Sequence, residues 1–156
     1  MPNVTDKQWI EKQLGGNKTM TTEFLDLSSV DLNDTFEPEV LPDGEEVQLV
    51  ITSMLIDQDK NGNRYIMPFF DVEGQPKVKD ISKYMPIPRQ DMAPKELNNA
   101  KLDITTFGEA FGIDFSGQLD IKNDVIGQKG WAILGRGKDK RDGSSINTVK
   151  KFTTGA

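Results

Sequence analysis

The chain contains neither cysteine nor histidine among its 156 residues. Without cysteine it can form no disulfide framework and no thiolate metal site. Without histidine it also lacks a common zinc ligand, the usual general base and one member of the Ser-His and Cys-His nucleophile pairs. Among enzymes, only those that use carboxylates or lysine as catalytic groups remain compatible with this composition. We therefore predict a non-enzymatic protein with no catalytic residue, no metal site and no cofactor.

Long apolar runs are also missing from the sequence. No stretch approaches the roughly 18 apolar residues that a membrane-spanning helix needs. The beginning of the chain lacks the basic segment and apolar run of a signal peptide. The absence of cysteine fits a reducing compartment. We therefore expect a cytoplasmic protein without a membrane partner.

Charge is present in both signs but is distributed unevenly. The net charge is −6. Residues 1–57 hold 3 basic and 12 acidic side chains, a net of −9, whereas residues 58–156 hold 16 basic and 13 acidic side chains, a net of +3. The last 30 residues alone carry 7 basic and 2 acidic side chains. A basic surface is therefore available in the second half of the chain, although the protein as a whole is acidic.

The first 46 residues divide into two segments of different composition. For residues 1–22 the sequence predicts either an exposed arm that docks only in an oligomer or a short helix. Thr5 would cap this helix, and Gly15-Gly16 would end it. Residues 23–46 contain nine acidic side chains and no lysine or arginine. We interpret them as an extended lead-in, pinned by apolar side chains to one domain at 47–156. These apolar residues are Phe24, Leu25, Leu27, Val30, Leu32 and Phe36.

Alternating apolar residues predict strands after the lead-in. The first strand begins at Glu45, and its apolar positions at a period of two are Val47, Leu49, Ile51 and Leu55. A turn at 58–63 leads into a second strand at 64–73, which Pro68 restricts to an edge or a bulge. Three more strands are predicted at 77–85, 130–136 and 144–153. On the fourth of the five, Trp131 is assigned to the core.

One helix is predicted between the third and fourth strands. Pro94 suits its first position, apolar residues recur at spacings of three and four from Leu97 to Phe111, and Gly112 suits its end. The resulting order is β-β-β-α-β-β. This order is the plan of a five-stranded OB-fold-like Greek-key barrel. We therefore predict a mainly β protein of this class, preceded by an N-terminal arm.

Basic and aromatic side chains gather where this fold binds its ligands. An OB-fold uses its second and third strands and the loops that join strands one–two and four–five. Aromatic rings there stack on unpaired bases, and lysine and arginine neutralise phosphates, so the combination favours single strands over duplex. The predicted nucleic-acid-binding residues are Arg64, Tyr65, Phe69, Lys77, Lys79, Lys83, Tyr84, Arg136, Lys138, Lys140, Arg141, Lys150, Lys151 and Phe152.

Each of these groups also has a purely structural interpretation. Tyr65, Phe69 and Tyr84 could face the core, although Tyr65 and Phe69 fall opposite the apolar positions of the second strand, which favours exposure. The basic residues of the loop at 137–143 could simply form a soluble hairpin tip. The prediction therefore rests on these groups falling together on one surface.

Two patterns of acidic residues are weaker indications of metal binding. Residues 57–62 begin like an EF-hand calcium loop, but Pro68 stands where the bidentate glutamate belongs. Asp71, Glu73 and Asp80 could form the carboxylate site of a metal nuclease. Nothing else in the sequence converges on them, so we interpret them as solvated strand ends.

Several short motifs resemble small bacteriophage single-stranded-DNA-binding proteins. They are LDLSSVD at 25–31, FEP at 36–38, LPDG at 41–44, NGN at 61–63, FDV at 70–72, YMP at 84–86, FGEAFGI at 107–113 and IGQKG at 126–130. The resemblance extends from about Leu25 to Phe152. It implies an OB-fold, sequence-independent binding of single-stranded DNA, and work in phage DNA replication, recombination or repair in the cytoplasm of the host cell.

Single-stranded DNA is accordingly the expected partner. Replication or recombination proteins and a second copy of the chain are left open as further partners. The acidic lead-in could instead compete with DNA or recruit such proteins. The alternative functions are a protein-interaction or virion component that uses the same barrel, with the acidic segment as its contact, and a metal nuclease.

Overall fold

The computed structural model describes residues 23–155, which fall into two units, 23–35 and 36–155. The arm or short helix predicted for residues 1–22 lies outside the described residues. Among the described residues, every helix and strand belongs to the second unit.

Residues 23–35 form turns. Asp26 accepts the N–H of Ser28 at 2.9 Å, and Asp31 accepts the N–H of Asn33 at 3.0 Å, as in Asx turns. Hydrogen bonds from the Ser28 hydroxyl and N–H hold the pKa of Asp26 below its usual value. The apolar side chains of this unit are exposed, namely Phe24, Leu25, Leu27, Val30 and Leu32.

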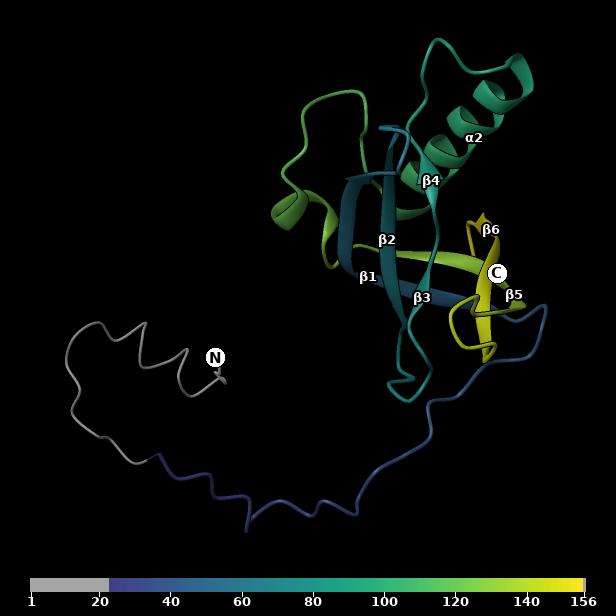
Figure 1. Cartoon of the computed structure of the whole chain (residues 1–156). Coiled ribbons are helices and arrows are strands. Elements are labelled where there is room, and N and C mark those ends of the chain that lie inside the picture. Colours follow the sequence, from purple (N-terminus) through teal and green to yellow (C-terminus); the bar gives the residue numbers. More distant parts are fainter. Residues whose placement is uncertain (1–22, 156) are drawn as a thin grey trace, which may run out of the picture. The chain divides into compact units, whose positions relative to one another are not determined.

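Residues 36–155 contain one antiparallel sheet of six strands (Figure 1). The strands are β1 (Glu46–Gln58), β2 (Arg64–Val72), β3 (Ile81–Ser82), β4 (Met85–Pro86), β5 (Lys129–Lys138) and β6 (Ser145–Thr153). Their order is β3-β2-β1-β5-β6, and β4 pairs with β2. The helix α2 (Pro94–Phe111) lies between β4 and β5 in the chain. The prediction of a mainly β protein with one α-helix at this place is confirmed for the described residues.

A β-bulge divides β1 into two parts. The apolar residues through Ile51 enter the core as predicted, but the pairing with β2 shifts between Ile51 and Ser53. An extra residue in a strand moves every later side chain to the other face of the sheet. Met54 therefore packs against the core, whereas Leu55 is 39% exposed. The predicted alternation that grouped Leu55 with the core residues is wrong.

The predicted third strand is two short strands, β3 and β4, because Pro68 interrupts their pairing with β2. The carbonyl of Pro68 accepts the N–H of Lys83 at 3.3 Å, so the backbone hydrogen-bonding groups of Pro68 face β3 and β4. Because proline has no N–H, it cannot donate a hydrogen bond to these strands in return. On its other side β2 pairs with β1, so Pro68 does not make β2 an edge strand. The proline instead opens a gap between β3 and β4, and this gap contains Lys83 and Tyr84.

The helix α2 has the predicted boundaries. Pro94 lies in its first turn, and Gly112 ends it in the left-handed conformation, with a φ of 68°. Its buried side packs against β4, β5 and β6. Glycine is required where β5 meets the end of the helix, since a Cβ atom at Gly130 would lie 2.7 Å from the carbonyl oxygen of Ala110.

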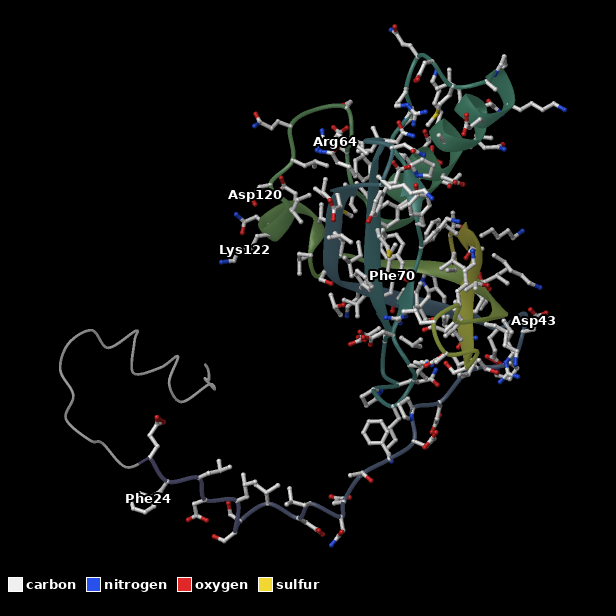
Figure 2. All side chains as sticks on the ribbon, in the orientation of Figure 1. Phe24, Asp43, Arg64, Phe70, Asp120 and Lys122 are labelled. Atoms are coloured by element: carbon white, nitrogen blue, oxygen red, sulfur yellow. The ribbon has the colours of Figure 1, made fainter. Side chains whose placement is uncertain are left out.

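The core is centred on Phe70 of β2 (Figure 2). Its ring centroid lies 5.4 Å from that of Phe111, 6.1 Å from that of Phe107 and 6.2 Å from that of Phe152. The segment after α2 returns to this core and includes one π-helical turn, η1 (Ile121–Val125). Its core-packed residues are Phe115, Leu119 and Ile121.

The β5–β6 hairpin completes the sheet. Ala132 faces the core, so Trp131 lies on the opposite face, half-buried, with Gly155 against its ring. The predicted core position of Trp131 is therefore wrong. At the two ends of the strand order, β3 and β6 approach each other.

Candidate nucleic-acid interface

The outer face of β2 carries the predicted aromatic residues. Ile66, Pro68 and Phe70 are buried, so the alternating residues Tyr65 and Phe69 point away from the core and are half-buried. This placement agrees with the prediction that both rings are exposed. It follows directly from the period of two in a strand with one buried face.

Tyr84 adds a third ring to this face. Its ring centroid lies 4.8 Å from that of Tyr65, with the two planes tilted by 40°, and Tyr84 is 48% exposed. Pro68 is responsible for this position, because Tyr84 occupies the gap that the proline opens between β3 and β4. The two tyrosines lie at a typical distance for a stabilising aromatic pair, yet Tyr84 keeps much of its surface open to a ligand.

Two apolar residues on the same face were not predicted as site residues. Leu55 of β1 pairs with Met67 of β2, which lies between Tyr65 and Phe69 on the outer face. Leu55 reaches this face only because of the bulge in β1. For Met67, the alternation of buried and exposed positions along β2 was the one sequence signal that could have placed its side chain on the outer face. Together, Leu55, Tyr65, Met67, Phe69 and Tyr84 form what we call the aromatic patch.

A cleft of about 520 Å³ continues from the aromatic patch. Phe69 belongs to both, and the opposite wall is formed by the outer residues of β6 and by the β5–β6 loop. Lys77 and Lys79 line the cleft beside Phe69. The remaining lining residues are Phe36, Pro38, Pro76, Val78, Asp80, Ser82, Asp139, Arg141, Ile146, Asn147 and Thr148.

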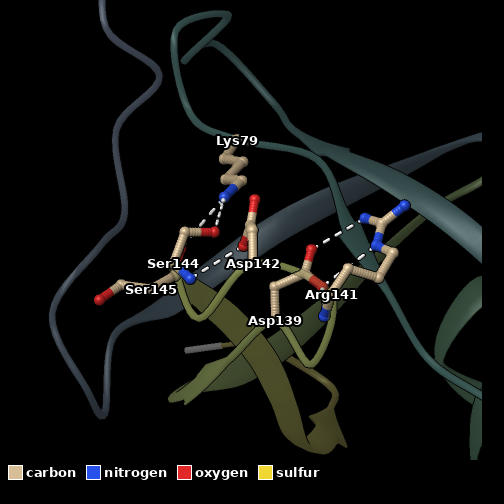
Figure 3. Close-up of polar contacts among 6 residues, drawn as sticks. All are labelled: Lys79, Asp139, Arg141, Asp142, Ser144 and Ser145. Atoms are coloured by element: carbon tan, nitrogen blue, oxygen red, sulfur yellow. Dashed lines mark hydrogen bonds and ion pairs between the residues drawn. The ribbon is translucent and has the colours of Figure 1, made fainter.

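The two lysines of the cleft already have partners. The Nζ atom of Lys77 lies 5.6 Å from the ring centroid of Phe36, a cation–π contact. The Nζ atom of Lys79 donates to Ser144 Oγ at 3.0 Å and to the carbonyl of Ser145 at 3.3 Å (Figure 3). Lys79 thus links the chain before β3 to the start of β6.

The β5–β6 loop is less basic than its sequence indicates. Arg141 donates to Asp139 through Nε at 3.1 Å and through a terminal nitrogen at 2.8 Å (Figure 3). These bonds, with one from the Arg141 N–H, lower the pKa of Asp139 to about 2, so the pair stays ionised over the ordinary pH range. The positive charge of Arg141 is therefore balanced within the loop.

Two further predicted cations have structural partners. Arg136 donates to the carbonyl groups of Val40 and Leu41, both at 3.1 Å. Lys150 forms an ion pair with Asp43 at 2.9 Å. Both side chains therefore hold the segment before β1 against the hairpin.

The other predicted residues separate into two groups. Five of the predicted cations form no ion pair, side-chain hydrogen bond or cation–π contact within residues 23–155: Arg64, Lys83, Lys138, Lys140 and Lys151. Phe152 is placed differently from the prediction. Its ring lies 5.4 Å from Phe107 and 5.6 Å from Phe111, so it packs in the core cluster and not on the outer face.

The acidic residues near the cleft do not converge as a metal site. Asp71 and Asp80 lie together, and burial, the hydrogen bond with Asp80 and its negative charge all raise the pKa of Asp71. Glu73 instead pairs with Lys129 at 2.8 Å. In the part of the chain that the structure describes, no three acidic side chains are grouped so that they could hold a metal ion.

No family model matches the chain, and no curated protein matches it. Within residues 23–155, none of the helices combines the length and the apolar character that crossing a membrane requires.

Proposed function

We propose that the chain is a non-enzymatic protein that binds single-stranded DNA without sequence preference. The observation that carries this proposal is the continuity of the aromatic patch with a lysine-lined cleft through Phe69. Unpaired bases would stack on Tyr65, Phe69 and Tyr84, at roughly 1–3 kcal/mol per base. Phosphates would be attracted by the lysines of the cleft and by the unpaired cations of β2, the β3–β4 gap and the β5–β6 hairpin.

An OB-fold-like Greek-key barrel is the architecture that we propose for this site. The strand order around β1 and the approach of β3 to β6 support it, as do the bonds from Lys79 to Ser144 and Ser145. In such a barrel the second and third strands and the loop between the last two strands form the ligand groove. The aromatic patch and the cleft occupy these elements.

The biological role that we propose is phage DNA replication, recombination or repair in the cytoplasm of the host cell. It is supported by the resemblance of the sequence motifs to small bacteriophage single-stranded-DNA-binding proteins. Proteins of the replication or recombination machinery and a second copy of the chain are further proposed partners.

Titration with fluorescently labelled oligo-dT across a series of salt concentrations tests the proposal. We expect binding at low salt and a steep linear fall of log affinity with log salt, because phosphate contacts release counterions. A duplex of the same length should bind more weakly, since its bases are already stacked. Absence of oligo-dT binding at low salt would refute the proposed function.

A second candidate function is a protein-interaction or virion component. The exposed apolar side chains of residues 23–35, among them Phe24 and Leu25, favour it, because they lie between acidic residues in a segment without helix or strand. Such a component would bind little oligo-dT at any salt concentration. It would instead lose a protein partner when Phe24, Leu25 and Leu32 are changed to serine.

A further inference from the structure

Residues 36–41, which we call the strap, line the cleft that we assign to DNA through Phe36 and Pro38. We propose that the strap is an autoinhibitory element that holds Phe36 against Lys77 in the cleft and leaves it when single-stranded DNA enters. This inference rests on the proposed function and adds a regulatory device to the same site. The two ends of the strap are attached unequally.

One end of the strap is firmly fixed at Leu41. The buried side chain of Asn147 accepts the N–H of Leu41 at 2.8 Å and donates to its carbonyl at 2.9 Å. Arg136 donates to the same carbonyl at 3.1 Å, and the Leu41 side chain packs against the core. Asn147 is the one buried polar residue of the described chain, and two of its three bonds hold Leu41.

The other end of the strap is loosely held. At Glu39 two backbone bonds form a short parallel bridge, from Glu39 N–H to the carbonyl of Lys77 and from Lys79 N–H to the carbonyl of Glu39, both at 2.8 Å. In the described structure, the side chains from Phe36 to Glu39 form no hydrogen bond and no ion pair. Phe36 is 55% exposed. Residues 36–39 can therefore leave the cleft while Leu41 stays in place.

The strap places an aromatic ring where single-stranded DNA would place a base. Phe36 lies beside Lys77 and lines the cleft with Pro38, while the exposed Glu37 and Glu39 next to them in the chain would repel an approaching phosphate. A strand of DNA that reaches Lys77 must therefore displace Phe36. The strap should lower the affinity of the resting protein and discourage weak, non-specific contacts.

A covalent lock between the strap and its partner strand tests this inference. Glu39 and Val78 are paired in the parallel bridge, so cysteines at these two positions are placed to form a disulfide. Because the wild-type chain has no cysteine, the double variant Glu39→Cys/Val78→Cys can form only this intramolecular disulfide. We expect the oxidised variant to bind oligo-dT at least fivefold more weakly than the same variant after reduction. The wild-type chain, treated with the same oxidant, should be unaffected.

The outcomes separate the inference from the proposed function. If neither the wild-type chain nor the reduced variant binds oligo-dT, the proposed function fails and the inference fails with it. If the wild-type chain binds and the oxidised and reduced variants bind equally, only the inference is overturned.

Hydrogen exchange on the unmodified protein provides an independent readout. Saturating oligo-dT should speed exchange at the amides of Glu39 and Lys79, because both take part in the bridge that DNA would open. Slower exchange at these two amides would overturn the inference.

The variant Glu37→Gln/Glu39→Gln should bind oligo-dT at least threefold more tightly than the wild type. The control Glu96→Gln/Glu109→Gln on α2, with the same change in net charge, should bind like the wild type.

Discussion

The two faces of β2 carry similar aromatic residues with different roles. On the inner face, Phe70 is completely buried and contacts three other phenylalanine rings. On the outer face, Tyr65 and Phe69 remain half-exposed beside Tyr84 and a lysine-lined cleft. The role of an aromatic residue in this strand therefore follows from which face it occupies. A ring that is already surrounded contributes to stability, and a ring with open surface can bind.

The largest effect is expected at the centre of the inner face. Replacing Phe70 by alanine should lower the free energy of unfolding by about 3–5 kcal/mol, because it removes buried apolar surface and leaves a cavity. The measurement is urea denaturation followed by tryptophan fluorescence. Phe69→Ala, one position along, is the matched control and should cost less than half as much. Equal losses would contradict the division between the two faces.

The outer face should show the opposite behaviour. Tyr84→Ala should weaken oligo-dT binding by about 1–3 kcal/mol, since one stacking platform is lost, while the free energy of unfolding changes little. Binding is measured by fluorescence anisotropy at constant salt. The control is Leu102→Ala, which changes another exposed apolar residue, on α2, and should leave the affinity unchanged. An affinity of Tyr84→Ala equal to that of the wild type would remove this ring from the proposed site.

A smaller effect is expected from the unpaired cations at the tip of the β5–β6 hairpin. Lys138→Gln/Lys140→Gln removes two unpaired charges and should reduce the slope of log affinity against log salt by about 1.4, at about 0.7 for each phosphate contact to a single strand. The control is Lys95→Gln/Lys101→Gln on α2, which changes the net charge equally. The idea fails if both pairs of substitutions change the slope by the same amount.

The smallest effect concerns the two carboxylates at the end of the outer face. The raised pKa of Asp71 means that the folded protein holds a proton there more tightly than the unfolded chain does. Stability should therefore fall as the pH rises from the unfolded value near 3.8 through the higher folded value. Asp71→Asn should be more stable than the wild type at pH 7, by less than about 1 kcal/mol because the pair is largely solvated.

Thermal unfolding of the Asp71→Asn variant and the wild type at pH 3, 5 and 7 measures this difference. The advantage of the variant should disappear at pH 3, where Asp71 is protonated in the wild type as well. An advantage that stays constant across this pH range would mean that repulsion between Asp71 and Asp80 is not its cause.

Much of the fold could be predicted because its signals are local. The helix α2 could be predicted from Pro94 to Gly112 by a proline suited to the first turn, an apolar period and a terminal glycine, all within one segment. The exposure of Tyr65 and Phe69 followed from alternation along β2 alone. The division of the third strand was missed, because it depends on which side of β2 the backbone of Pro68 faces. Leu55 was misplaced because a bulge depends on pairing with another strand.

The candidate site was predicted in composition but not in charge balance. Tyr65, Phe69 and Tyr84 lie together as expected. The sequence showed Arg141 two residues from Asp139, but local spacing does not reveal whether the two side chains form a bidentate pair. The partner carbonyls of Arg136 lie about a hundred residues away in the chain. No local pattern could have identified them.

The sequence by itself determined which residue types are available and which segments form strands or a helix. Composition and periodicity are properties of a residue and its near neighbours, and the chain carries them before it folds. The tertiary structure alone decided that Phe152 belongs to the core, that Leu55 joins the outer face and that Asn147 holds the strap. These outcomes depend on strand register and on contacts between distant segments, which form only when burial of the shared core brings those segments together.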